Sequence, residues 1–247
     1  MKRRLTRLPP LHANRRRDSP GAVGERMRNE KTFPFAGERL VARPSGALWW
    51  PAAGLLCVSD LHLGKSERMA RRGGPLLPPY EVVDTLTRLE EDIEATDPRA
   101  VISLGDAFDD MDAARTLLPE ARDWIGRLMA GRDWTWITGN HDPAPVALGG
   151  HAADGLTCGP LSFVHIATEG GTHEVSGHYH PKASLRVRGR AVSRPCFLHD
   201  ATRLILPAYG TFTGGLRSRD PALSGLMGAN ARAILAGTPM VEIPMPR

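Results

Sequence analysis

The stretch Gly54-Leu-Leu-Cys-Val-Ser-Asp-Leu-His62 decides the fold, because a short apolar run ends directly on two metal-preferring side chains. The same arrangement recurs at Ala100-Val-Ile-Ser-Leu-Gly-Asp106, and an amphipathic pattern over residues 80–95 separates the two runs. Short apolar runs bounded by glycine indicate buried strands, and the pattern between them indicates a helix. We therefore expect strand, helix, strand, with polar side chains at the edge where open α/β sheets place their sites.

The unit repeats along the chain. Residues 112–130 predict a second helix, and Trp134-Thr-Trp-Ile-Thr138 predicts a strand that leads into Gly139-Asn-His-Asp142. Upstream, residues 39–43 and 47–50 flank turn-forming residues and predict a hairpin.

Short strands dominate the sequence after residue 150. We expect them at residues 161–165, 174–176, 183–187, 191–198 and 203–206, with a last one near Val241. Only residues 229–235 look helical in this half. A first half that alternates strands and helices, joined to a strand-rich half, predicts an α/β protein with two packed sheets and helices outside.

Basic charge is concentrated at the N-terminus. Of the 32 Lys and Arg residues, ten lie in residues 1–31 together with three of the 27 Asp and Glu residues, so the rest of the chain is close to neutral. This Arg-rich, weakly apolar composition predicts a disordered arm over residues 1–36, followed by one domain over residues 37–247. The arm either binds phosphate backbones or, since Met27 offers a second start, is an upstream extension that is not always translated.

Neither a membrane span nor a secretory signal is readable in the sequence. No apolar run approaches the ~18 residues that a bilayer requires, and no apolar segment follows the basic N-terminus. The odd count of three cysteines, Cys57, Cys158 and Cys196, without CxxC spacing, argues against disulfides or a structural zinc site. We expect a cytoplasmic protein that does not bind membranes.

Seven side chains at or near the expected strand ends have the chemistry of a metal centre. They are Asp60, His62, Asp106, Asn140, His165, His178 and His180. Hard divalent cations prefer carboxylate and amide oxygens, and manganese, iron or zinc also accept neutral imidazoles. The set can therefore hold two ions, an arrangement suited to in-line attack at phosphorus.

Each ion is expected to take its own group of ligands. The first group comprises Asp60, His62 and His180. The second group comprises Asn140, His165 and His178. Asp106 is expected to bridge the ions, because a carboxylate has two oxygens where an imidazole offers one free donor.

One of these ligands has a rival in the sequence. His173 also lies close to His178, but His165 ends an apolar strand whereas His173 follows a Gly-Gly-Thr loop, so we favour His165. Three further histidines lack partners at ligand spacing and are read as surface or core residues: His12, His151 and His199.

His141 is predicted to be catalytic rather than a ligand. An imidazole beside the ions can donate to a phosphoryl oxygen or protonate the leaving alkoxide. The next residue, Asp142, either orients that ring or caps the turn at Pro143.

Two basic groups are candidates for phosphate contacts. Lys65, Arg68 and Arg72 follow the first ligand pair, with Arg71 beside them, and we expect them to bind substrate near the ions. A second set, Arg186, Arg188 and Arg190, alternates with apolar residues on one expected strand face. A solvated surface is the alternative for both sets, and we favour it for the second.

The joint order of these motifs resembles the calcineurin-like metallophosphoesterases. Further segments look like the bacterial ligase-associated metallophosphoesterases (the PdeM or Mpe family) over residues 38–243. These segments are Gly46-Ala-Leu-Trp-Trp-Pro51, Ser59-Asp-Leu-His-Leu-Gly-Lys65, Leu104-Gly-Asp106, Gly139-Asn-His-Asp142, Gly177-His-Tyr-His-Pro181 and Pro207-Ala-Tyr-Gly-Thr-Phe-Thr-Gly-Gly215. In one departure, Phe108 precedes Asp109 where that family commonly carries a Phe-His pair.

The resemblance implies a four-layer α/β/β/α sandwich of two mixed sheets. It also implies a manganese-dependent phosphodiesterase that acts as an endonuclease on single-stranded DNA, encoded beside an Lhr-type helicase, a DNA ligase and an exonuclease in a repair cluster. Iron and zinc are alternative metals, because these ligands accept several ions.

Two other functions remain open. One is a phosphomonoesterase or small-nucleotide phosphodiesterase with the same ions, and the other is a non-catalytic scaffold, which the presence of His141 disfavours.

Overall fold

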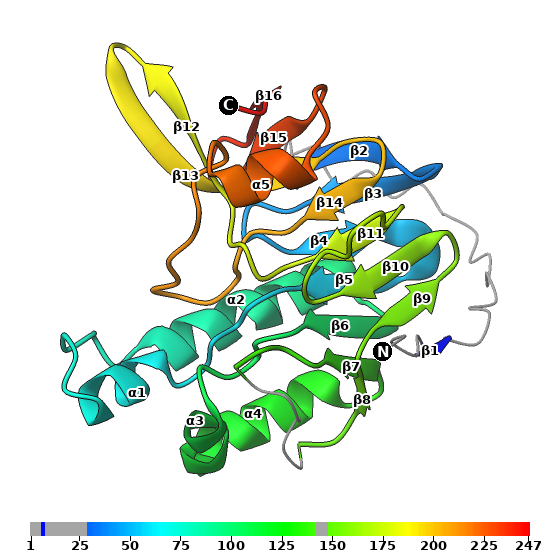
Figure 1. The fold of residues 1–247 in the computed structure, drawn as a ribbon. Helices are drawn as coiled ribbons and strands as arrows, with labels where there is room; N and C mark the ends of the chain where they lie inside the picture. Colours follow the sequence, from blue (N-terminus) through cyan, green and yellow to red (C-terminus); the bar gives the residue numbers. More distant parts are fainter. Residues whose placement is uncertain (1–5, 8–28, 142–147) are drawn as a thin grey trace, which may run out of the picture.

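Two mixed sheets stack on each other in the part of the chain that the computed structural model describes, residues 6–7, 29–141 and 148–247 (Figure 1). In order across the first sheet, the strands are β2 (Lys31–Phe35), β3 (Glu38–Ala42), β4 (Leu48–Trp50), β5 (Leu55–Val58), β6 (Ala100–Leu104), β7 (Asp133–Ile137) and β8 (His151–Ala153). The first four are antiparallel, and β5 to β8 run parallel to one another.

The second sheet has nine strands among the residues described. Eight follow the order β1 (Thr6–Arg7), β9 (Leu156–Cys158), β10 (Leu161–Val164), β11 (Glu174–Ser176), β14 (Arg203–Ile205), β13 (Arg190–His199), β15 (Arg232–Leu235) and β16 (Val241–Pro244). The ninth, β12 (Lys182–Val187), pairs with β13 and forms a hairpin with it.

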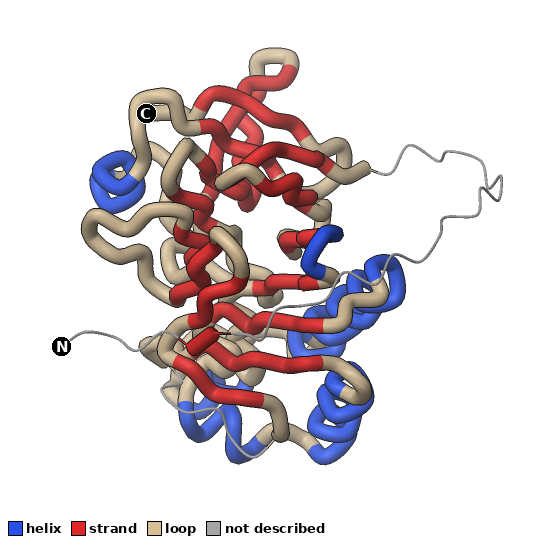
Figure 2. Tube along the Cα trace, turned by 90° about the vertical axis from the view of Figure 1, so that its right-hand side faces the viewer, coloured by secondary structure: helices blue, strands red, loops and turns tan. Residues whose placement is uncertain are grey.

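Helices lie on the outer sides of the strands (Figure 2). They are a short 3₁₀ helix η1 (Pro51–Ala53) and the α-helices α1 (Lys65–Arg71), α2 (Glu81–Thr96), α3 (Met111–Thr116), α4 (Pro119–Met129) and α5 (Pro221–Leu226). Apolar side chains of α2 and α4 pack on one face of the first sheet, and α5 packs on the outer face of the second. The four-layer α/β/β/α sandwich implied by the resemblance is thereby confirmed.

The location of β5 between two hydrophobic cores explains why every residue of this strand is apolar. Leu55 and Cys57 face the core between the two sheets, whereas Leu56 and Val58 face the core under the helices. Successive side chains of a strand point to opposite faces, so a strand covered on both faces needs a continuous apolar run. All four residues are at most 1% exposed, which fixes the strand whose end carries the first ligands.

The helix expected over residues 112–130 is wrong, because the structure divides it into α3 and α4. Leu117 and Leu118 have extended backbone angles, with ψ of 128° and 143°. Pro119 disfavours the helical conformation for the residue before it and then starts α4, where its missing N–H costs nothing. The amphipathic pattern over residues 80–95 places Tyr80 and Val83 on the apolar face, but Tyr80, which precedes α2, is 52% exposed and Val83 within α2 is 56% exposed.

The helix expected over residues 229–235 is also wrong. Arg232–Leu235 form β15, which pairs with both β13 and β16. A short apolar run cannot distinguish a buried strand from a buried helix, and here the partner strands on both sides decide.

The folded region begins earlier than the sequence predicted. Lys31–Phe35 lie inside the predicted arm, yet they form β2 and pair with β3. Residues Thr6–Arg7 pair with β9. The basic composition concealed the alternation of exposed and buried residues in β2. Residues 1–5 and 8–28, including Met27 and His12, lie outside the described residues, so the disorder expected there stays a prediction.

Within the described ranges, none of the helices combines the length and the apolar character that crossing a bilayer requires.

Candidate metal centre

The predicted ligands lie in the loops that leave the carboxyl ends of neighbouring strands. Asp60 and His62 follow β5, Asp106 follows β6, and Asn140 follows β7. Because these three strands are parallel and adjacent, their ends meet at one edge of the first sheet. The second sheet supplies the other three predicted ligands from the ends of β10 and β11: His165, His178 and His180.

The first donor set is formed by Asp60, His62 and His180, whose donor atoms lie within 4.8 Å of one another. Asp60 Oδ1 lies 3.2 Å from His180 Nε2. His180 Nε2 in turn lies 3.4 Å from His62 Nε2. Asp60 and His62 are buried, so water cannot easily solvate these groups in place of an ion.

The second donor set adjoins the first. It contains Asp106, His165 and His178, and Asn140 lies beside them. His165 Nε2 lies 3.4 Å from Asp106 Oδ2 and 3.0 Å from Asn140 Oδ1. Asp106 Oδ2 is also 4.0 Å from His62 Nε2, and so it faces both sets.

These spacings fit divalent cations. Nitrogen and oxygen ligands at about 2.0–2.2 Å from one ion lie about 3.0–3.5 Å from each other. The distances from His180 to Asp60 and His62, and from His165 to Asp106, fall in that range. All donor atoms within each set lie within 4.8 Å of one another. The seven residues predicted from the sequence are therefore brought together with the chemistry and spacing of two adjoining ion sites.

Hydrogen bonds decide which carboxylate oxygen is free for an ion. Asp60 Oδ2 accepts from the Ser59 hydroxyl and from the backbone N–H of His178 at 2.9 Å. Asp106 Oδ1 accepts from the backbone N–H of His141 at 2.9 Å. Asp106 Oδ2 makes no such hydrogen bond and faces both donor sets, so it is the oxygen placed to serve both ions, and the bridging role expected for Asp106 stays a prediction.

The backbone is strained at most of the predicted ligands. Positive φ angles occur at Asp60 (54°), His62 (44°), Asp106 (46°), His178 (68°) and His180 (46°). Side-chain-bearing residues avoid this region, at a cost of about 1–3 kcal/mol each, and such strain clusters at functional sites. The surrounding structure holds the backbone in these conformations, and they direct the side chains toward a common centre.

Two glycines leave room for this arrangement. A Cβ atom on Gly105, whose φ is 77°, would lie 2.2 Å from His165 Nδ1. A Cβ atom on Gly177 would lie 1.8 Å from the Ser59 hydroxyl oxygen. The glycines that precede Asp106 and His178 are therefore required by packing inside the centre.

Asp109 was not among the site residues predicted from the sequence, yet it contacts the first donor set. It is fully buried, and its Oδ1 lies 2.8 Å from His62 Nδ1 and 3.2 Å from Lys65 Nζ. Its Oδ2 accepts from Arg68 at 2.7 Å. A carboxylate on the second nitrogen of a ligating imidazole fixes the ring and its tautomer. The carboxylate three residues after Asp106 was the available signal, but it was read only as a departure from a family pattern.

His141 lies beside both donor sets without joining either. Its Nδ1–H donates to the backbone oxygen of Asp109 at 2.9 Å, and its ring centroid is 5.2 Å from that of His62. His62, Asp109 and His141 also group together, but His62 Nδ1 contacts Asp109, so this group forms a hydrogen-bonded layer next to the first donor set. Asp142 lies outside the described residues.

The electrostatics favour ionised carboxylates. Burial raises the pKa of Asp106, but the hydrogen bond and charge of His165 and the His141 N–H outweigh it and lower that pKa to about 2. Burial lowers the pKa of His165, but Asp106 and Asp60 outweigh it and raise that pKa. Burial and the charge of His165 both lower the pKa of His178, which keeps this imidazole neutral and able to coordinate.

The basic residues predicted to contact the substrate differ in exposure and in their ion-pair partners. Lys65 and Arg68 are each only 20% exposed and contact Asp109, so they neutralise a buried carboxylate. Arg72 is 61% exposed and lies 3.6 Å from Asp110. Arg71 contacts Glu67, Asp110 and Asp112. A contact between any of these residues and a substrate stays a prediction.

The remaining histidines lie away from the centre. His173, the rival of His165, is exposed and packs near Phe35. His151 is exposed in β8, and His199 is buried beside Phe33 with Glu242 at 3.6 Å.

Two adjoining Asp and His donor sets, held at strand ends inside a four-layer sandwich, define a hydrolase that works with a pair of divalent metal ions. The chain belongs to the calcineurin-like phosphoesterase family, whose model matches residues 54–200. It is therefore a metal-dependent phosphoesterase, and the resemblance stated from the sequence is confirmed.

A solved structure gives a closer comparison. The chain is similar to a protein described as Pseudomonas putida nuclease MPE, with 30% sequence identity and a TM-score of 0.69. The match covers 87% of this chain and 100% of the other. A search of curated proteins found no significant match.

Proposed function

We propose that this enzyme is a two-metal phosphodiesterase that cleaves single-stranded DNA as an endonuclease. The observation that carries the proposal is the position of Asp106 Oδ2 between two donor sets, 3.4 Å from His165 Nε2 and 4.0 Å from His62 Nε2. The similarity to a bacterial nuclease supports a diester of nucleic acid as the substrate class.

Each ion would be held by a separate set of residues, with Asp106 common to both. Asp60, His62 and His180 would hold one, and Asn140, His165 and His178 the other. When bound, the ions supply the positive charge that activates a water molecule and stabilises the phosphoryl oxygens. The mixture of oxygen and nitrogen donors is compatible with manganese, and iron and zinc satisfy the same set.

His141 is the residue that we assign to proton transfer. Its Nδ1–H is held by the Asp109 carbonyl, so Nε2 is the atom that can take up and release a proton. With Nε2 protonated, the ring can donate to a phosphoryl oxygen or to the leaving alkoxide. Asp109 supports this role indirectly, because its backbone orients His141 while its carboxylate orients His62.

The proposal extends to a biological setting. A single-strand endonuclease would produce ends that a ligase or an exonuclease can process, and a helicase would supply the single strands. We therefore propose a role in DNA repair alongside an Lhr-type helicase, a DNA ligase and an exonuclease.

The decisive experiment offers the manganese-loaded enzyme three substrates side by side: bis-p-nitrophenyl phosphate, p-nitrophenyl phosphate and circular single-stranded DNA. We expect cleavage of the diester and linearisation of the circle, with much slower hydrolysis of the monoester. Preference for the monoester together with an intact circle would indicate a phosphomonoesterase and refute the proposal.

Two variants separate the assigned roles. His141→Ala should keep both ions and lose about 10²- to 10⁴-fold in hydrolysis, the contribution of a general acid or base. Asp106→Ala should lose metal as well as activity, because it removes the shared oxygen. Equal metal loss in the two variants, measured by elemental analysis, would contradict the roles.

A further inference from the structure

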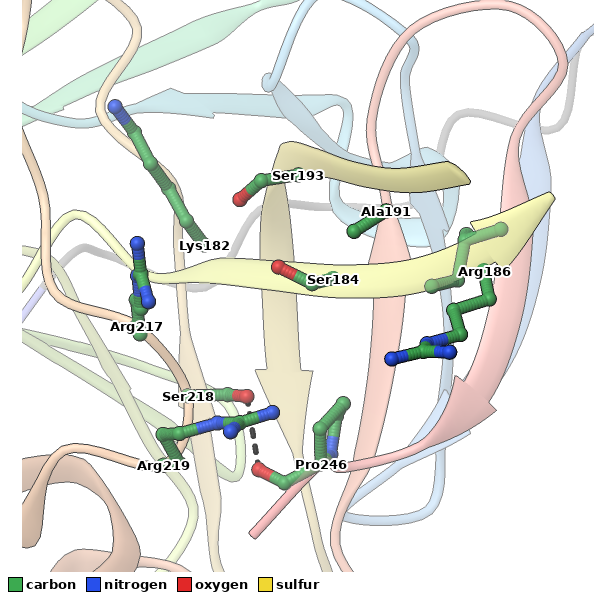
Figure 3. A pocket seen from close by; sticks show the side chains of 10 residues that line it. Lys182, Ser184, Arg186, Ala191, Ser193, Arg217, Ser218, Arg219 and Pro246 are labelled. Atoms are coloured by element: carbon green, nitrogen blue, oxygen red, sulfur yellow. Dashed lines mark hydrogen bonds between the residues drawn. The ribbon is translucent and has the colours of Figure 1, made fainter. Parts of the chain in front are cut away.

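A basic pocket lies on the second sheet, next to the loop that carries His180. It has a volume of about 400 Å³, and its walls come from the β12–β13 hairpin, residues 217–219 and Pro246 (Figure 3). Lys182, Arg186, Arg217 and Arg219 supply four cationic side chains to its lining.

The floor of the pocket is one face of the hairpin. Lys182, Ser184 and Arg186 are two residues apart along β12, so their side chains point to the same side. Their direct partners on β13 continue this face, since Ser193 lies opposite Ser184 and Ala191 lies opposite Arg186. Arg188 and Arg190 do not belong to it, because Arg188 is in the turn and Arg190 begins the returning strand. The expectation that the three arginines share one strand face is therefore wrong.

The facing wall is held against the hairpin by backbone hydrogen bonds. The N–H of Ser218 donates to the Lys182 oxygen at 2.8 Å, and the N–H of Lys182 donates to the Leu216 oxygen at 2.8 Å. The Ser218 hydroxyl donates to the Pro246 oxygen at 2.8 Å, which ties the C-terminal segment to this wall. The cationic side chains of the pocket are therefore carried by backbone segments that hydrogen bonds hold together.

The charge of the pocket is uncompensated. The lining includes the hydroxyls of Ser184, Ser193 and Ser218 but no Asp or Glu among the residues that the structure describes. Among the described residues, no carboxylate lies within ion-pair distance of Arg186, Arg217 or Arg219. In contrast, Arg71 on α1 contacts three carboxylates. Planar guanidinium groups match phosphate oxygens in pairs, and hydroxyls add further donors, so the lining suits phosphate groups.

The pocket is connected to the metal centre. Lys182 follows the ligand His180 by two residues, so their Cα atoms are at most about 7.6 Å apart. The N–H of Leu216 donates to the oxygen of Tyr179 at 3.1 Å, between the two ligands His178 and His180. A strand held at the metal centre could therefore reach the pocket within a few nucleotides.

We propose that this pocket is a second phosphate-binding subsite, which holds the backbone of a nucleic-acid strand a few nucleotides from the bond cleaved at the metal centre. The inference rests on the proposed phosphodiesterase function and adds a determinant that favours a polynucleotide over a small diester. Backbone phosphates contribute affinity without sequence preference, as expected for arginine contacts of this kind.

The test measures binding of a fluorescent single-stranded oligonucleotide to the manganese-loaded protein in a His141→Ala background. Arg217→Ala/Arg219→Ala removes two pocket cations, and Arg188→Ala/Arg190→Ala removes two exposed cations from the same hairpin as a matched control. Each lost phosphate contact should lower affinity about fivefold at 0.1 M salt and reduce the slope of log K against log salt by about 0.7. We therefore expect about a 25-fold loss for the pocket variant and less than about a twofold loss for the control.

The results separate this inference from the proposed function. With His141 restored, the pocket variant should hydrolyse bis-p-nitrophenyl phosphate like the wild type, because that diester is too short to reach the pocket. Equal oligonucleotide binding by the pocket variant and the control would overturn the inference while leaving the phosphodiesterase intact. A mononucleotide that competes as well as the oligonucleotide would also overturn it. An inactive wild type would refute the proposed function, and the binding comparison would still report on the pocket.

Discussion

Asp109→Asn tests how the protein positions its metal ligands. The substitution keeps the shape of the side chain but removes a buried negative charge that contacts His62, Lys65 and Arg68. The amide can still accept from His62 Nδ1, but it cannot polarise the imidazole or neutralise the two cations. The ion that His62 holds should therefore bind more weakly, and the ion held by Asn140 and His165 should not.

The size of the effect follows from these contacts. Loss of a carboxylate behind a ligating imidazole costs about 10- to 100-fold in metal affinity. Breaking a fully buried ion pair costs about 3–5 kcal/mol of folding free energy. Lys65 and Arg68 are 20% exposed and can turn partly toward water, so we expect a stability loss of about 2–3 kcal/mol in the metal-free protein.

Calorimetric titration with Mn²⁺ and urea unfolding of the chelated protein measure the two quantities. Asp110→Asn is the matched control, because Asp110 caps α3 and contacts Arg71 but is absent from the contacts of His62 among the described residues. Metal affinity should be unchanged in this control. Unchanged affinity in Asp109→Asn, or equal weakening of both ions, would refute the reasoning.

Three further predictions concern packing, pH and metal. Gly105→Ala should destabilise the protein by about 2–4 kcal/mol in urea unfolding and abolish metal binding, because the new Cβ would overlap His165 at a positive φ; near-wild-type stability would contradict the packing argument. Burial raises the pKa of Asp200, but the N–H groups of Gly228, Thr202 and Arg203 outweigh it and lower that pKa. Asp200→Asn should therefore cost about 1–2 kcal/mol of stability at pH 7, with the difference disappearing as the pH falls through the lowered pKa of Asp200 below about 4; a pH-independent difference would argue against it. Since the imidazoles must lose their protons to bind metal, Mn²⁺ affinity should fall from pH 7.5 to 6 with release of protons on binding, measured calorimetrically in two buffers; a constant affinity would exclude histidine ligation.

Most of the predicted ligands could be singled out in the sequence because they lie close to the end of an apolar strand. Asp60 and Asp106 follow runs that are buried on both faces, and strand order then brings their side chains together. For these two residues, the local apolar pattern therefore predicts the position in the folded protein. The division of the helix at Pro119 was also readable, but the amphipathic pattern on both sides obscured it.

The remaining parts depend on long-range contacts that no local pattern contains. Asp109 gains its role from His62, 47 residues earlier in the sequence, and this contact draws Lys65 and Arg68 inward. The basic pocket joins a hairpin to residues 217–219, so its charges lie too far apart in sequence to be recognised as one group. Strand β15 was missed for a similar reason, because its partners lie elsewhere in the chain.

The most direct measurement for the central claim is anomalous diffraction from crystals grown with Mn²⁺. Two ions should appear, one among Asp60, His62 and His180 and the other among Asn140, His165 and His178, with Asp106 Oδ2 bound to both. A single ion, or ions that do not share that oxygen, would contradict the account.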